Sequence, residues 1–292
     1  MGSTLAGRVV GYAGFYPSGY AKAFLYSNGS MQNLGTLGGL ASTANAINNG
    51  GQVVGWANTS NGDQHAFLYS NGLMQDLGTL GGNSSIATGI NNSGQVVGQA
   101  ETGGIDNSNG RYIQHAFLYS NGSLKDLGTL SGLDTTATAI NDKGQVVGWG
   151  DTGNGDDHAF LYSNGHMQDL GTLYSTPDPF SYAQSINDNG QVVGYASGSD
   201  GGSHVAFLYS NGSMQNLNSL IAPNSGWTLY DAFAISDNGQ IAVQGVSSNG
   251  QEADALILTP IVPEPSSLIA WTGLCAMGRA CKVFCVRSVV WG

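Results

Sequence analysis

The chain has 292 residues and a net charge of −11; only 9% of its residues are charged, and 46 are glycine. Before residue 261 it has 18 acidic but only 5 basic side chains, which argues against binding the phosphate backbone of a nucleic acid. Hydrophobic residues make up 41% of the chain, well above a disordered composition, so we expect it to fold. Its abundant Gly, Asn, Ser and Thr favour turns and strands over helix interiors.

A repeated unit, whose equivalent tyrosines lie 43 to 50 residues apart, predicts the architecture. The segment Gly-Gln-Val-Val-Gly occurs at 51–55, 94–98, 144–148 and 190–194, with variants at 7–11 and 239–243. Ala-Phe-Leu-Tyr-Ser-Asn-Gly follows it at 23–29, 66–72, 116–122, 159–165 and 206–212. Length varies mainly between these two segments and after Leu-Gly-Thr-Leu, so we expect loops there.

In chain order, each unit predicts four short strands. The first has the form Ala-x-Ala-Ile-Asn, as at 44–48, and ends in an Asx-x-Gly turn. The second is Gln-Val-Val-Gly-x-Ala. The third is Ala-Phe-Leu-Tyr, closed by Asn-Gly, which is the strongest short hairpin signal. The fourth is Met-Gln-Asp-Leu-Gly-Thr-Leu, as at 74–80. No segment before residue 260 has helical periodicity with caps.

Apolar residues on consecutive strand positions decide how these units pack. Val53 and Val54 are adjacent, and so are the residues of 66–69. Successive strand side chains point to opposite faces, so both faces of each sheet must be buried. We therefore predict an all-β repeat β-propeller of about six blades, each a four-stranded antiparallel meander. Its ring should be closed or nearly closed, with Val53, Phe67 and Tyr69 buried between blades. The alternative is a β-solenoid-like stack.

The two ends of the sequence predict the domain organisation. We expect residues 1–260 to form the propeller, with a truncated first repeat preceded by further chain that includes a signal peptide. Residues 1–14 themselves have no basic start followed by an apolar run. The three cysteines lie in the tail, at Cys275, Cys281 and Cys285, so the propeller owes nothing to disulfides.

Two family resemblances follow from these motifs. Asp-Leu-Gly-Thr-Leu-Gly-Gly, Ala-Ile-Asn-x-x-Gly-Gln-Val-Val-Gly and His-Ala-Phe-Leu-Tyr together resemble the HAF-repeat family of bacterial extracellular proteins, over residues 7–259. The tripeptide itself begins at His65, His115 and His158; Lys22, Val205 and Asp254 replace the histidine elsewhere. The resemblance implies export to the cell surface or extracellular space, and it implies no activity for particular residues.

The tail, residues 261–292, resembles a PEP-CTERM sorting signal. Its motif is Pro263, Glu264 and Pro265, followed by an apolar stretch and basic residues. The resemblance implies recognition by an exosortase-type sorting machinery and only transient membrane contact through the tail. The apolar stretch, 268–278, is shorter than the roughly 20 residues that span a bilayer. We expect 261–292 to pack little against the propeller and to contain one short helix near 268–277.

The recurrent histidines are the first candidate for chemistry. His65, His115 and His158 occupy one position of the repeat, and a metal site is one interpretation. Equivalent positions on successive blades are too far apart for one ion, and Lys22 and Asp254 occur at the same position, so we favour structural hydrogen bonding near the strand start. His166 and His204 fall outside this position and suggest no further site.

Asp-rich turns and loops are the second candidate. They lie at 141–142, 187–188, 236–237, 151–157 and 197–202. Calcium binds hard oxygens in such loops, but Asx-x-Gly is also ordinary turn chemistry, which we favour. The glycosylation-like triplets at Asn28, Asn121 and Asn211 coincide with the Asn-Gly turns, and we interpret them as turns.

For function, the sequence favours a protein that is not an enzyme and needs no cofactor. It has no Gly-x-Ser-x-Gly motif, and near-identical blades make symmetric surfaces whereas active sites need asymmetry. Our leading hypothesis is a structural or adhesive protein of the cell surface or of an extracellular polysaccharide matrix. A lectin-like module, in which loops such as 101–114 capture a sugar, is the alternative. A secreted hydrolase is a third.

Overall fold

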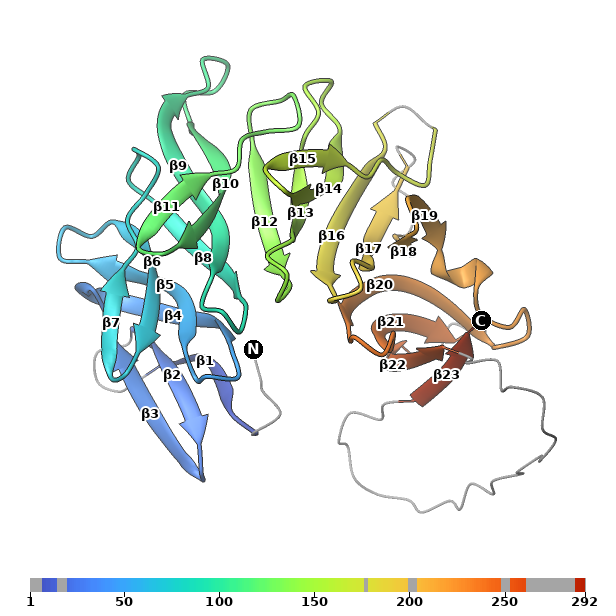
Figure 1. Cartoon of the computed structure of the whole chain (residues 1–292), viewed down its shortest axis with the longest axis horizontal. Coiled ribbons are helices and arrows are strands. Elements are labelled where there is room, and N and C mark those ends of the chain that lie inside the picture. Colours follow the sequence, from blue (N-terminus) through green and yellow to red (C-terminus); the bar gives the residue numbers. More distant parts are fainter. Residues whose placement is uncertain are drawn as a thin grey trace.

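A computed structural model describes residues 7–14, 20–175, 178–198, 204–247, 253–260 and 287–291. Almost all of its regular structure is β, arranged in six sheets that follow one another in chain order along an arc (Figure 1). One short 3₁₀-helix, η1 (Leu217–Ser219), precedes the sixth sheet.

Each sheet is built from consecutive strands, and the second to fifth sheets are complete four-stranded antiparallel meanders. The first three sheets comprise β1 (Val9–Gly14), β2 (Ala21–Ser27), β3 (Ser30–Gly35); β4 (Gly38–Ile47), β5 (Val53–Thr59), β6 (Gln64–Ser70), β7 (Leu73–Asp76); and β8 (Ser85–Ile90), β9 (Val96–Ile105), β10 (Tyr112–Ser120), β11 (Ser123–Asp126). The last three comprise β12 (Thr135–Ile140), β13 (Val146–Asp151), β14 (Asp157–Ser163), β15 (His166–Asp169); β16 (Phe180–Ile186), β17 (Val192–Ser197), β18 (Val205–Ser210), β19 (Ser213–Asn216); and β20 (Trp227–Ile235), β21 (Ile241–Ser247), β22 (Ala253–Pro260), β23 (Arg287–Trp291).

The Asn-Gly hairpins have the backbone that their sequence predicts. In the turn between β6 and β7, Asn71 has φ 51° and Gly72 has φ 83°. Both central residues therefore occupy the left-handed region that a type I′ turn requires and that Asn-Gly tolerates best. The other four Asn-Gly turns that follow Phe-Leu-Tyr-Ser repeat this conformation, at Asn28, Asn121, Asn164 and Asn211.

The second glycine of Gly-Gln-Val-Val-Gly is required by a bulge in the first strand of the sheet. In the fourth sheet the pairing of β12 with β13 shifts register between Ala137 and Ala139. A Cβ atom on Gly148 would collide with the carbonyl oxygen of Thr136. The same collision would occur at Gly55, Gly98 and Gly194, so this glycine makes room for the neighbouring strand.

Alternate residues of the middle strands pack against different neighbouring sheets. Val53 and Phe67, both fully buried, belong to a core shared with the first sheet. Val54 and Ala66, also fully buried, belong to a core shared with the third sheet. Together with Tyr69, which is 7% exposed, these residues confirm the predicted burial on both faces, which a solenoid coil with one wet face would not provide.

The outer strands end earlier than the sequence predicts. β7 ends at Asp76, and Leu77 leaves the strand to become buried against the third sheet. The carbonyl oxygen of Gly78 then accepts a 2.5 Å hydrogen bond from Ser85 Oγ, whose oxygen also accepts from the backbone N–H of Ala66. The Leu-Gly-Thr-Leu segment is therefore mostly a link between sheets that a serine from the next sheet fixes in place.

The Gln and Tyr of the repeat connect the outer parts of neighbouring sheets. Gln75 Nε2 donates to the Tyr119 hydroxyl over 2.8 Å, and Gln32 does the same to Tyr69. Lys125 takes the role of this glutamine and donates to Tyr162 over 2.7 Å. Because these bonds join equivalent residues of successive repeats, they explain why both residue types recur.

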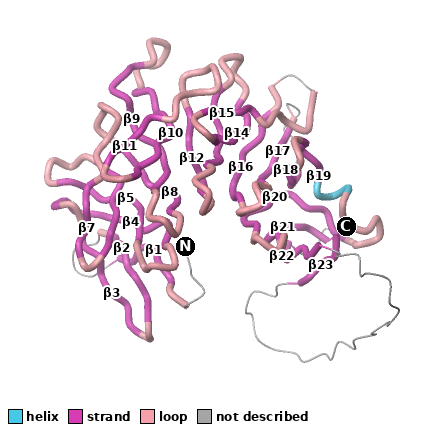
Figure 2. The backbone as a smooth tube through the Cα atoms, viewed as in Figure 1, coloured by secondary structure: helices cyan, strands magenta, loops and turns pink. Residues whose placement is uncertain are grey.

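The ends of the arc differ from its middle. Among the described residues the first sheet has no counterpart of β4, and in the sixth sheet β23 pairs in parallel with β22. The first and sixth sheets lie on either side of an opening (Figures 1 and 2). The arc is thus open, whereas a closed or nearly closed ring was predicted.

The tail is described only at its end. Pro263, Glu264, Pro265 and the helix predicted at 268–277 lie outside the described residues. Residues 287–291 form β23 and pair with the last sheet, whereas the whole tail was expected to pack little against it.

Candidate functional site

One end of the arc, which we call the turn end, holds a ladder of asparagines. Asn141, at the end of β12, donates from Nδ2 to Gln145 Oε1 over 2.8 Å and to the carbonyl oxygen of Asn187, in the next sheet, over 3.0 Å. Its Oδ1 atom accepts from the backbone N–H groups of Lys143 and Gln145. The same bond to the next sheet is made by Asn48, Asn91 and Asn187.

A second row of contacts runs beside this ladder. Asp142 Oδ1 accepts from the backbone N–H of Asn92 over 2.8 Å, and Asp188 Oδ1 accepts from that of Asp142 over 2.9 Å. Asp237 accepts in the same way from Asp188. These turns line a shallow depression of about 330 Å³. The carboxylates proposed as turn residues thus bind backbone N–H groups of the preceding sheet. Within the described ranges, no three acidic, His or Cys side chains converge as metal ligands.

The recurrent histidines form pairs with aspartates of the adjacent outer strand. His65 Nδ1 lies 2.8 Å from Asp76 Oδ2, and the same distance separates His115 from Asp126 and His158 from Asp169. Asp76 also accepts from the backbone N–H of Gly78. Each pair therefore fixes the third strand to the link that leaves the sheet, which confirms structural hydrogen bonding near the strand start.

The opposite end, which we call the loop end, has a cavity of about 470 Å³ between the third and fourth sheets. It lies at the end of β12 away from the asparagine ladder. Its residues come from the β9–β10 hairpin, from the start of β12, and from β13 and the loop after it. They are Gln99, Arg111, Gln114, Asp134, Thr136, Trp149, Asp151, Gly155 and Asp157.

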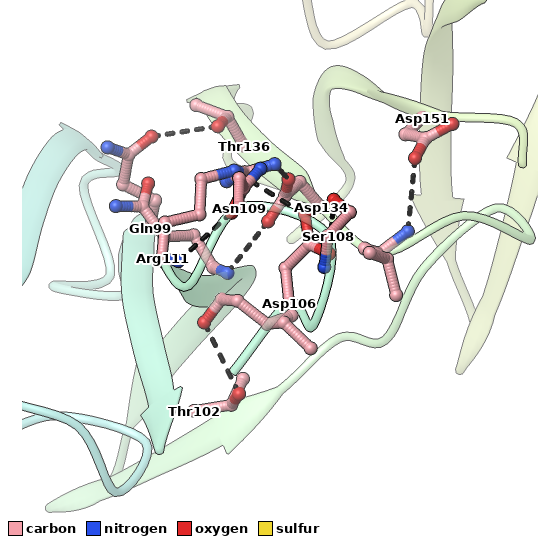
Figure 3. Close-up of polar contacts among 12 residues, drawn as sticks. Gln99, Thr102, Asp106, Ser108, Asn109, Arg111, Asp134, Thr136 and Asp151 are labelled. Carbon is pink, nitrogen blue, oxygen red and sulfur yellow. Dashed lines mark hydrogen bonds and ion pairs between the residues drawn. The ribbon is translucent and has the colours of Figure 1, made fainter. Parts of the chain in front are cut away.

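Arg111 and the backbone of Gln114 tie the β9–β10 hairpin to the fourth sheet (Figure 3). Arg111 donates to Asp134 Oδ2, and the other oxygen of Asp134 accepts from the backbone N–H of Gln114 over 2.9 Å. The hydrogen bond to Asp134 raises the pKa of Arg111, which therefore stays cationic. Both carboxylate oxygens of Asp134 are thus held by the third sheet.

Asp106 shapes the tip of the same hairpin (Figure 3). Its Oδ1 atom accepts from the hydroxyl of Ser108 over 2.7 Å and from the Ser108 backbone N–H over 2.8 Å. These hydrogen bonds lower the pKa of Asp106, with a smaller contribution from the charge of Arg111. The hairpin that was predicted to be a loop at 101–114 is therefore mostly strand, with an ordered turn at its tip.

Aromatic rings continue from the cavity into the fifth sheet. Trp149 packs edge-on against Tyr182, with ring centroids 5.0 Å apart. The Tyr182 hydroxyl donates to Asp157 over 2.7 Å, and burial together with this carboxylate raises the pKa of Tyr182 well above its usual value. Tyr195 stacks on Tyr182 and on His204, which pairs with an aspartate of the sixth sheet. His204 therefore takes part in an interface, although the sequence suggested no role for it.

Comparisons with known proteins place this fold. No family model and no curated protein matches the chain. Among solved structures, TolB from Acinetobacter baumannii matches 86% of the chain and 63% of its own length, with TM-score 0.51 and 15% identity. The β-propeller domain of the Trilobed protease from Pyrococcus furiosus, described as having an open velcro topology, matches 86% and 75%, with TM-score 0.53 and 8% identity. A puromycin-hydrolyzing peptidase of Mycobacterium tuberculosis matches 88% and 41%, with TM-score 0.55 and 12% identity.

The chain has a β-propeller fold. The predicted fold class is thereby confirmed, and each of the six sheets is a blade. At these identities the likeness extends to the fold alone. The chain also spans less than two thirds of the TolB and peptidase chains. No helix in the described part of this propeller is long and apolar enough to cross a membrane.

The sequence indicated some of the cavity residues and missed others. The hairpin at 101–114 was singled out as a loop that could capture a sugar, and it supplies Arg111 and Gln114. The Asp-rich loop at 151–157 was also singled out, and it supplies Asp151 and Asp157. Trp149 and Asp134 were missed, since each stands at an ordinary position of the repeat. Arg111 could have been recognised from the sequence as a candidate site residue, because it is one of only 5 basic residues before residue 261.

Proposed function

We propose that this chain is an exported, non-enzymatic propeller with a structural or adhesive role at the cell surface or in an extracellular polysaccharide matrix. The observation that carries the proposal is the contrast between the ends of the blades. Every complete interface repeats the Asn ladder at the turn end, whereas the long β9–β10 hairpin and its cavity at the loop end belong to one interface. A rigid scaffold with varied loops on one face is the usual build of a binding protein.

The sorting tail supports export as part of this proposal. Pro263, Glu264 and Pro265 stand after the last repeat strand, in the place where a PEP-CTERM signal is expected. In the proposal, an exosortase-type machinery recognises this motif and the tail contacts the membrane only during sorting. Extracellular polysaccharide is the partner that the mature propeller meets.

The sorting step is tested by expressing the full chain, behind a general secretion signal, in a bacterium that has an exosortase system. Changing Pro263, Glu264 and Pro265 together to alanine should leave the protein in the cell-membrane fraction. The Ser266→Ala, Ser267→Ala variant is the matched control and should be sorted normally. Equal amounts of all three proteins outside the cell would contradict a sorting role for the motif.

The adhesive role is tested with the purified full chain and extracellular polysaccharide isolated from the producing cells. We expect the protein to co-sediment with the polysaccharide without releasing reducing ends. Failure to co-sediment would contradict adhesion to this matrix. Release of reducing ends that the Asp157→Asn change abolishes would instead identify a hydrolase.

A further inference from the structure

The cavity between the third and fourth blades combines three features of a small-ligand site. Its volume of about 470 Å³ falls within the roughly 300–1,000 Å³ of pockets that hold small organic ligands. An aromatic ring, Trp149, lines it, and so do several planar polar side chains. The cavity also joins two blades, and interfaces between structural units are common ligand positions.

Its polar groups are fixed in place before any ligand arrives. Asp134 is held by Arg111 and by a backbone N–H, and Asp151 accepts from the backbone N–H groups of Leu133 and Gly153. Gln99 Oε1 accepts from the Thr136 hydroxyl over 2.7 Å. Each carboxylate oxygen retains a lone pair beyond these bonds, and the amide group of Gln99 retains its donors. Preorganised groups of this kind lose little entropy when a ligand binds.

Two lining side chains have hydrogen-bonding capacity to spare. Gln114 uses its backbone N–H on Asp134, and no hydrogen bond involves its carboxamide in the part of the chain that the structure describes. Asp157 uses Oδ2 to accept from Tyr182, which leaves Oδ1 for a ligand. Donors and acceptors are thus both on offer, as a ligand with several hydroxyl groups requires.

The charge of the cavity limits the ligand further. Three carboxylates, those of Asp134, Asp151 and Asp157, line it against one guanidinium, that of Arg111. An anionic ligand such as a uronic acid or a phosphate would be repelled, whereas hydroxyl or ammonium groups would be attracted. The C–H face of a sugar ring can also pack on the negative face of an indole.

From these observations we propose that the cavity binds a saccharide, through one or more neutral or amino-bearing sugar residues that pack on Trp149 and hydrogen bond to Gln114 and Asp157. The inference rests on the proposed adhesive function and names its ligand class and its site. Gln99, Arg111 and the remaining aspartates hold the walls and bond to further hydroxyl groups.

The test uses the full chain on an array of immobilised oligosaccharides of glucose, N-acetylglucosamine, glucosamine and glucuronic acid. We expect binding to a neutral or amino sugar and none to glucuronate. Trp149→Ala should weaken binding about tenfold or more, as loss of an aromatic anchor does. Gln114→Ala, which removes a carboxamide that makes no hydrogen bond in the described structure, should also weaken it.

The matched control is Trp56→Ala, which removes the tryptophan at the equivalent position of the second blade. This variant should bind as the unchanged protein does, and thermal melts will show whether both tryptophan variants are folded. The inference would be overturned if the protein bound no sugar or preferred glucuronate. It would also be overturned if Trp149→Ala and Gln114→Ala both bound sugar as tightly as the unchanged protein does. If the protein still co-sediments with polysaccharide in those cases, the site is wrong but the adhesive function stands; if it does not, both fail.

Discussion

At the turn end of the propeller the same asparagine bonds recur from blade to blade, whereas at the loop end the interfaces differ in their side chains. Asn48, Asn91 and Asn141 each donate to the carbonyl oxygen of the equivalent residue in the next blade over 3.0 Å. At the loop end the residue after the second repeat glycine is Trp56, Gln99, Trp149 or Tyr195 in the four complete blades. The two ends are built on the same strands, yet only one of them repeats its chemistry.

Under the proposed function, this difference separates the residues that stabilise the molecule from those that bind its ligand. Because the contacts repeat, each interface between neighbouring blades adds a similar amount to the stability of the molecule, as in other repeat proteins. Residues that depart from the repeat are not part of this recurring scheme, so their chemistry can differ from blade to blade, as recognition requires. Substitutions at the turn end should therefore change unfolding, and substitutions at the loop end should change adhesion.

The largest expected effect comes from a change in the strands that both ends share. Gly148→Ala places a methyl group against the carbonyl oxygen of Thr136 at the β12 bulge. Because backbone must move, we expect a loss of about 3 kcal/mol or more in the free energy of unfolding, measured by urea titration.

The control for this change is Gly89→Ala. A Cβ atom at Gly89 would lie 3.2 Å from a methyl group of Val97, and the corresponding residue of the next blade is Ala139. This variant should unfold nearly as the unchanged protein does. Similar losses for the two variants would show that the bulge does not explain the repeat glycine.

The next effect tests the turn end directly. Asn141 is only 5% exposed, and its side chain donates two hydrogen bonds and accepts two. Asn141→Ala removes all four. We expect it to lower the free energy of unfolding by about 2–3 kcal/mol, since buried backbone groups lose their partners.

Asn141→Ser is the matched variant, because Ser236 occupies this position in the sixth blade and its hydroxyl oxygen accepts from the backbone N–H of Gln240. It should lose less stability than Asn141→Ala. Neither variant should alter co-sedimentation with polysaccharide while it is folded. A loss below about 0.5 kcal/mol for Asn141→Ala would mean that the ladder does not stabilise the interface.

The smallest effect concerns the aromatic rings beside the cavity. Burial and Asp157 raise the pKa of Tyr182 in the folded protein, whereas an unfolded tyrosine ionises near pH 10. The unfolded chain therefore gives up this proton first, so that the contribution of Tyr182 to stability is complete below about pH 10 and falls as the pH rises further.

Tyr182→Phe removes this contribution. Between about pH 8 and about pH 11, its urea midpoint should fall less than that of the unchanged protein. Tyr195, whose pKa burial also raises, is present in both proteins. Equal falls for the two proteins would show that Tyr182 does not retain its proton on folding.

The sequence was sufficient for the repeated part of this molecule and insufficient for the rest. Consecutive apolar residues such as Val53 and Val54 predicted sheets buried on both faces, and Asn71-Gly72 predicted its hairpin, because both signals depend on local backbone geometry. The open arc was not predicted, since the repeat pattern describes each blade and its neighbour but not whether the first and sixth blades meet. The end of β7 at Asp76 also escaped, because Leu77 is as apolar in a link as in a strand.

The sequence indicated the cavity only through the hairpin at 101–114 and the Asp-rich loop at 151–157. Periodicity identifies positions within one blade but does not show which side chains of two blades face each other. Arg111 and Asp134 meet because β10 and β12 lie in neighbouring blades. Neither residue belongs to a motif whose spacing would have paired them.

The central claim, that the loop end binds and the turn end stabilises, is tested most directly by exchanging one hairpin. Residues 102–113 would be replaced by residues 59–63, which occupy the same register in the second blade. The exchange removes Arg111 and the hairpin tip and leaves every asparagine of the ladder in place. Co-sedimentation with polysaccharide and the thermal midpoint would be measured on the same preparation. The account predicts that co-sedimentation is lost while the midpoint stays within a few degrees; unchanged co-sedimentation, or a collapse of the midpoint, would contradict it.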